Sequence, residues 1–156
     1  MTGSLFETRT DAEIRREAVA ENQRRADDAL ADRGPLPLTA RQHRLLECLR
    51  GRQGRLQAIG LSELTQTLGA DARSIKGDVR DLVCTFRLPI VSSRDSEDGG
   101  YFFATTADER VSGTADYVKE IRALAERTAV IRNVHDMRTL FGQIAAELES
   151  ASRKDA

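Results

Sequence analysis

The sequence lacks tryptophan and contains only 4% aromatic residues, which is unusual for a strand-dominated fold and suits a helical one. Its two cysteines, Cys48 and Cys84, have no CxxC spacing and no neighbouring histidine, so neither a disulfide framework nor a zinc site is expected, and no cofactor is implied. No apolar run reaches the roughly 20 residues of a membrane span, and no signal peptide is recognisable. We expect a protein of the cytoplasm without membrane contact.

The sequence also lacks a strong overall charge, because 24 basic residues face 25 acidic ones. A protein that coats nucleic acid indiscriminately is therefore disfavoured. The charge is nevertheless unevenly distributed: residues 41–94 contain 10 basic and 5 acidic side chains, whereas the segments on both sides are acidic overall. This pattern still allows a selective nucleic-acid binder whose basic residues lie in the middle of the chain.

Two prolines mark a boundary in the N-terminal part of the chain. Residues 11–33 are rich in Arg, Glu, Asp and Ala, with apolar residues too sparse for a continuous stripe. The segment Gly34-Pro-Leu-Pro-Leu38 then ends any helix. We therefore predict a poorly anchored arm over 1–37, partly helical or disordered, a folded domain over 38–105, and C-terminal helices over 106–156.

The predicted domain begins with a helix capped by Thr39 and Gln42, which form a capping box. The run Leu56-Gln-Ala-Ile59 is then expected to form a short edge strand. A helix of about two turns should follow, capped by Ser62 and ended by Gly69.

Asp71 is positioned to cap a longer helix, the second of a helix-turn-helix pair. Its apolar residues Ile75, Val79, Leu82, Val83 and Phe86 share a face that must be buried. The opposite face is polar, cationic or small, and can approach another surface closely; it carries Arg73, Ser74, Lys76, Gly77 and Arg80.

A β-hairpin and further helices complete the chain. Two β-prone runs, Ile90-Val-Ser-Ser93 and Tyr101-Phe-Phe-Ala-Thr105, flank a polar loop with two glycines. Thr106 and Glu109 repeat the capping-box pattern before a long helix. The fold class predicted is mainly α with a small β-hairpin.

The order of these elements resembles the winged helix-turn-helix of the biotin-repressor and DeoR type over about 38–105. The resemblance is carried by Leu61-Ser-Glu-Leu64, Leu68-Gly69, Arg73-Ser-Ile-Lys76, Asp78-Val-Arg-Asp-Leu82, Pro89-Ile-Val-Ser92 and Gly99-Gly-Tyr-Phe102. The Leu5-Phe-Glu7 opening, the charged arm and the C-terminal helix also look like small prophage-encoded DNA-binding proteins.

This resemblance implies sequence-selective binding of double-stranded DNA, by a transcriptional regulator or a replication accessory protein. The sequence shows no nucleophile and base pairing, glycine-rich phosphate loop or carboxylate dyad, so an enzyme is not expected. In the family the second helix of the pair enters the major groove. Carried over to this sequence, the groove-facing residues are Arg73, Ser74, Lys76, Gly77 and Arg80, and contacts to the DNA backbone are expected from Ser62, Arg41, Arg44 and Arg94.

The predicted wing departs from the family pattern, because Asp95, Glu97 and Asp98 at its tip should repel phosphates. A protein-interaction module that docks a partner through the acidic wing and the terminal helices is therefore the alternative function. A nuclease that holds a metal with the same three acids is a weaker hypothesis. A cationic run such as Arg73, Lys76 and Arg80 is also more often a solvated helix face than a DNA reader.

Near the C-terminus, apolar residues recur at heptad spacing: Val134, Met137, Phe141, Ile144 and Leu148. Such a stripe more often packs within its own chain than between chains. Dimers are nevertheless common among proteins that read DNA grooves, so these five residues are the candidate dimerisation element.

Overall fold

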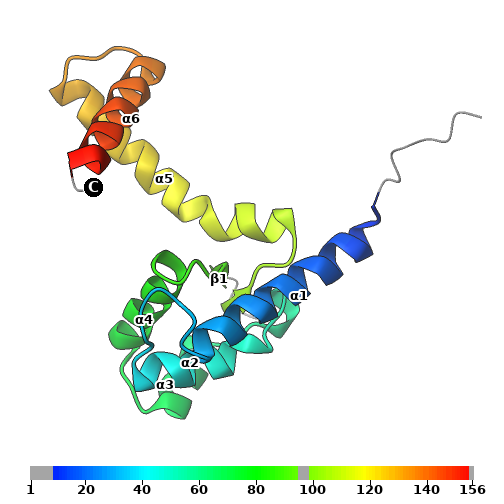
Figure 1. Cartoon of the computed structure of the whole chain (residues 1–156). Helices are drawn as coiled ribbons and strands as arrows, with labels where there is room; N and C mark the ends of the chain where they lie inside the picture. Colours follow the sequence, from blue (N-terminus) through cyan, green and yellow to red (C-terminus); the bar gives the residue numbers. More distant parts are fainter. Residues whose placement is uncertain (1–8, 95–98, 155–156) are drawn as a thin grey trace, which may run out of the picture. The chain divides into compact units, whose positions relative to one another are not determined.

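The structure is a computed structural model that describes residues 9–94 and 99–154. The chain divides into two compact units, Met1–Gly113 and Thr114–Ala156. In the described residues the fold is mainly helical, with one two-stranded antiparallel sheet, as predicted from the sequence (Figure 1). None of the described helices combines the length and the apolar character needed to cross a bilayer.

Helix α1 (Asp11–Leu30) is anchored more firmly than its sequence indicated. It buries Ala26 and Ala29 in the same core as the leucines of α2 (Ala40–Arg50), and the two helices lie side by side (Figure 1). The buried Asn22 amide nitrogen donates to Gln53 Oε1 and to the Ala104 carbonyl, both at 3.1 Å. The contact rests on small side chains and one buried amide, so no broad apolar stripe was needed.

The segment between α2 and the next helix does not form the expected strand. The capping box of Thr39 and Gln42 at the start of α2 is confirmed. Residues Arg55–Gln57 instead form a 3-10 turn, η1, which closes because Gln57 N donates to Gly54 O and Ala58 N to Arg55 O. Of the predicted strand only Ile59 pairs with β2, through an isolated antiparallel bridge to Tyr101, and Gln53 before η1 makes a second, parallel bridge to Phe103.

Two helices at a tight turn follow, α3 (Leu61–Leu68) and α4 (Ala72–Cys84). Gly69 ends α3 in the left-handed conformation and the Asp71 carboxylate caps α4, both as predicted. The prediction that Ser62 caps α3 is wrong, because the N-cap is Gly60, two residues earlier. Ser62 therefore lies inside the first turn.

The predicted hairpin is confirmed. Strands β1 (Ile90–Ser93) and β2 (Gly100–Phe103) pair in antiparallel register, with Ile90 opposite Phe103 and Ser93 opposite Gly100. The residues at its tip, including Asp95, Glu97 and Asp98, lie outside the described part of the chain. Phe103 of β2 belongs to the core of the first unit. The other largest fully buried side chains of this core include Leu45, Leu46, Leu49, Leu64, Ile75, Leu82 and Leu88.

Glu109, near the start of α5 (Ala107–Ile131), ties this helix to the hairpin and to η1. Its carboxylate accepts hydrogen bonds from the backbone nitrogens of Arg55 and Thr105, at 2.9 and 2.7 Å, and the predicted capping box with Thr106 is present. Desolvation raises the pKa of Glu109, but the hydrogen bonds from Thr105 and Arg55 outweigh it, and the pKa is lowered overall. The ionised carboxylate thus fixes the first turn of α5 within the first unit.

The second unit contains the rest of α5 and the helix α6 (Met137–Lys154). Asp136 caps α6 by accepting from the backbone nitrogens of Arg138 and Thr139. Among the described residues of this unit only Ala125 and Leu140 are buried apolar side chains. Its two helices therefore share a very small core.

Candidate nucleic-acid interface

Helix α4 presents a cationic face to solvent. Arg73, Lys76, Gly77 and Arg80 are all exposed and recur at helical spacing, while Ile75, Val79 and Leu82 on the opposite side are buried. We call these four exposed residues the α4 face. In the part of the chain that the structure describes, no hydrogen bond or ion pair engages the side chains of Arg73, Lys76 or Arg80. Their charges are therefore available to an external anionic surface.

The two acids of α4 are both engaged by residues of α2. Asp78 is only 5% exposed, and its carboxylate forms a bidentate pair with Arg41 of α2, through Arg41 Nε and Nη2. The hydrogen bond to Asp78 raises the pKa of Arg41. Asp81 accepts from the Gln42 amide at 3.2 Å. The pair with Arg41 thus removes Asp78 from the exposed surface, whereas Asp81 stays exposed.

Two of the predicted contact residues serve the fold instead of facing outward freely. Arg41 is held by Asp78, so its guanidinium is committed to joining α2 to α4. Ser74 is partly buried at the start of α4, where its backbone nitrogen and its hydroxyl both donate to Asp71. These bonds, led by the one from the Ser74 hydroxyl, lower the pKa of Asp71. The α4 N-terminus therefore already has its own carboxylate.

The remaining predicted contacts lie on elements other than α4. Arg44 is exposed, and its Nη2 donates to the Thr67 carbonyl at 3.0 Å near the C-terminus of α3. Ser62 is exposed in the first turn of α3, which has no side-chain cap. Arg94 is exposed directly after β1. Helix α3 thus offers a helix N-terminus with an exposed hydroxyl, a combination suited to an anion.

Gly77 lies in the middle of the α4 face, and the fold does not require a glycine there. Its backbone is helical, and a Cβ added to it would meet no atom within 4 Å. A glycine at an exposed helical position costs about 0.8–1 kcal/mol relative to alanine. The α4 face is consequently flat at its centre, which allows another surface to approach the backbone closely.

Gly77→Ala is therefore expected to raise the free energy of unfolding by about 0.8 kcal/mol, measured by urea denaturation. Gly142→Ala in α6 is the matched control, because that glycine is also helical, exposed and surrounded by open space. A similar gain is expected at both positions. A loss of stability for Gly77→Ala alone would mean that the α4 face is covered within the chain.

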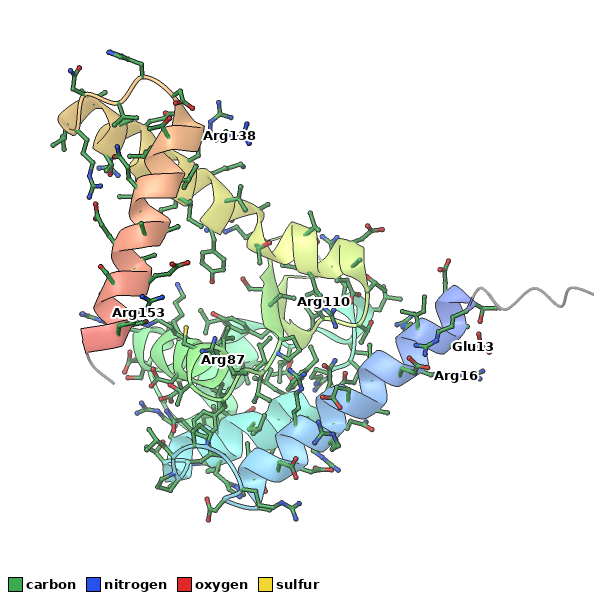
Figure 2. All side chains as sticks on the ribbon, turned by 45° about the horizontal axis from the view of Figure 1, so that its top comes forward. Glu13, Arg16, Arg87, Arg110, Arg138 and Arg153 are labelled. Carbon is green, nitrogen blue, oxygen red and sulfur yellow. The ribbon has the colours of Figure 1, made fainter. Side chains whose placement is uncertain are left out.

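Sequence reasoning missed the Arg41–Asp78 pair and one further cation beside α4. Figure 2 labels Arg87, which lies just beyond the C-terminus of α4, in the left-handed conformation with φ of 58°. It is exposed, and its carbonyl accepts a hydrogen bond from Arg25 of α1 at 3.3 Å. The only sequence signal for the ion pair was Asp78 itself, an acid at the margin of the apolar face of α4.

The five residues of the candidate dimerisation element differ in their exposure. Val134 precedes α6 and is half-buried, as are Met137 and Ile144 within the helix. Phe141 and Leu148 are exposed. The residue that packs fully inside the unit is Leu140, which the heptad spacing did not include.

Comparisons with known proteins give no assignment: the chain matches no protein-family model, no curated protein and no solved structure.

Proposed function

We propose that residues 38–105 form a winged helix-turn-helix that binds double-stranded DNA, with α4 in the major groove. The observation that carries this proposal is the α4 face: three cations without partners in the described chain surround a glycine, while the neighbouring acid Asp78 is buried against Arg41. An α-helix fits the major groove, and arginine is the side chain that most often reads guanine there.

The arrangement of the elements supports the same proposal. Helices α2, α3 and α4 are followed by the hairpin β1–β2, and the bridge from Ile59 to Tyr101 places a third short segment beside β2. This is the order of a winged helix. In that arrangement α3 crosses the DNA backbone, where its uncapped N-terminus and Ser62 suit a phosphate.

In this proposal Arg73 and Arg80 read base edges, because a guanidinium can donate to both acceptors of a guanine. Lys76 contacts phosphate as a point charge, and Arg44 and Arg94 neutralise phosphates on either side. The protein acts as a transcriptional regulator or a replication accessory protein in the cytoplasm. Arg41 supports α4 and does not read DNA.

The experiment that tests the proposal is fluorescence-anisotropy titration of a random-sequence duplex with the wild-type chain at two salt concentrations. Binding that weakens by at least about tenfold between 50 and 200 mM salt is expected, because contacts to several phosphates release counterions. A single-stranded oligonucleotide of the same length is the control and should bind more weakly. Absence of duplex binding at 50 mM salt would overturn the proposal and favour the protein-interaction alternative.

A further inference from the structure

The second unit leaves most of its large apolar side chains in water. Of the large hydrophobic residues that are exposed in the described chain, eight belong to Thr114–Ala156, although this unit is much the shorter one: Tyr117, Val118, Ile121, Leu124, Val130, Ile131, Phe141 and Leu148. A unit well below about 60 residues rarely buries enough surface to be stable by itself. Its fold therefore needs a partner surface.

A groove between α5 and α6 gathers several of these side chains. It has a volume of about 580 Å³ and is lined by Val118, Ile121 and Val130 of α5 and by Met137 and Phe141 of α6. Arg122 and Glu126 lie at its margin and pair with each other at 3.1 Å. We call this the α5–α6 groove. Figure 2 shows α6 between the labelled Arg138 and Arg153.

We propose that the occupant of the α5–α6 groove is the same unit of a second copy of this chain. Four of the exposed side chains line the groove and present roughly 100 Å² each, or about 400 Å² together, which suits a weak self-association at the low end of interface sizes.

The charges of the unit favour a second copy over a partner of one sign. Thr114–Ala156 contains seven basic and seven acidic residues, so two copies meet without net repulsion. In a twofold interface a surface meets itself, and residue i of one copy contacts residue j of the other in both directions. At the margin of the groove Arg122 and Glu126 carry opposite charges one helical turn apart, so Arg122 of each copy can face Glu126 of the other.

The inference goes beyond DNA binding and does not rest on it. The α4 face belongs to the first unit, and the residues of the groove belong to the second. Self-association and DNA binding can therefore be measured, and can fail, independently.

The test is the mass of the full-length chain without DNA, measured by sedimentation equilibrium between about 1 and 200 µM. At the highest of these concentrations the wild type is expected to approach twice the 17.3 kDa of one chain. Ile121→Glu/Phe141→Glu should weaken self-association at least about 100-fold, because both carboxylates would be buried in the interface without partners. These side chains are 53% and 47% exposed within one chain, so the substitutions leave the small core of the unit intact.

Leu56→Glu is the matched control, since Leu56 is 89% exposed in the first unit and the chemical change is the same. It should keep the dimer mass. If the glutamate variant loses its helical circular dichroism, Ile121→Gln/Phe141→Gln replaces it, because glutamine is a good helix former and is equally polar at the interface. A monomeric wild type at 200 µM, or folded groove variants that remain dimeric, would overturn the proposal.

Discussion

Replacement of both Arg73 and Arg80 by alanine is expected to lower the affinity for duplex DNA by about 100-fold. A bidentate arginine–guanine contact contributes about 1–3 kcal/mol, and 1.4 kcal/mol corresponds to a factor of ten in the dissociation constant. If either side chain also neutralises a phosphate, the slope of the logarithm of the binding constant against the logarithm of the salt concentration becomes shallower in the variant by about 0.9 per lost contact. Fluorescence anisotropy with a duplex selected from the random pool for tight binding measures both changes.

The fold should not be affected, because neither guanidinium takes part in a hydrogen bond or ion pair within the described chain, and both lie opposite the buried side of α4. Arg127→Ala/Arg138→Ala is the matched control, since it removes the same charge from exposed positions of α5 and α6. Equal weakening by both pairs would show that net charge, and not the α4 face, determines the affinity. An unchanged affinity for Arg73→Ala/Arg80→Ala would remove α4 from the interface.

The parts of the fold that the sequence predicted well depend on local interactions. The capping boxes at Thr39 and Thr106, the Asp71 cap and the left-handed Gly69 each involve residues within about four positions of one another. Such interactions can be recognised from spacing alone. The same holds for the buried face of α4, whose helical period is clear in the sequence.

The parts that the sequence did not predict depend on partners distant in the chain. Asn22 contacts Gln53 and Ala104, which are 31 and 82 positions away, so nothing near Asn22 indicates that α1 belongs to the core. Helix α1 packs through alanines, which leave no strong apolar stripe. The short strand at Leu56–Ile59 was wrongly predicted for the opposite reason, because local hydrogen bonds close this segment into η1.

The candidate site shows the same division between local and distant effects. The period of α4 placed Arg73, Lys76, Gly77 and Arg80 on one exposed face, and they are exposed. The role of Asp78 required knowledge of Arg41, 37 positions earlier. Asp78 is one of the five acidic residues counted in 41–94, and its pairing with Arg41 removes it from the surface and leaves the α4 face cationic.

Gly100→Ala is expected to cause the largest loss of stability among the glycine positions of the first unit. Gly100 begins β2, and a Cβ there would lie 2.3 Å from the Ile59 carbonyl oxygen and 2.9 Å from Gly60 N, both of them backbone atoms that have little freedom to move. Ile59 O accepts from Tyr101 N at 2.9 Å, so relief of the clash requires separation of this bridge. Overpacking together with the lost hydrogen bonds should cost about 2–3 kcal/mol.

Urea denaturation measures the loss, and hydrogen exchange at the Tyr101 amide reports whether it arises at the bridge, because that amide donates to Ile59. Gly51→Ala is the matched control: Gly51 caps α2 in a right-handed helical conformation, and an added Cβ would meet nothing within 4 Å. It should be nearly neutral. If Gly100→Ala is as stable as the wild type and Tyr101 exchange is unchanged, then β2 does not approach Ile59 as closely as the structure has it. The bridge between Ile59 and Tyr101 would then no longer support the proposed winged helix.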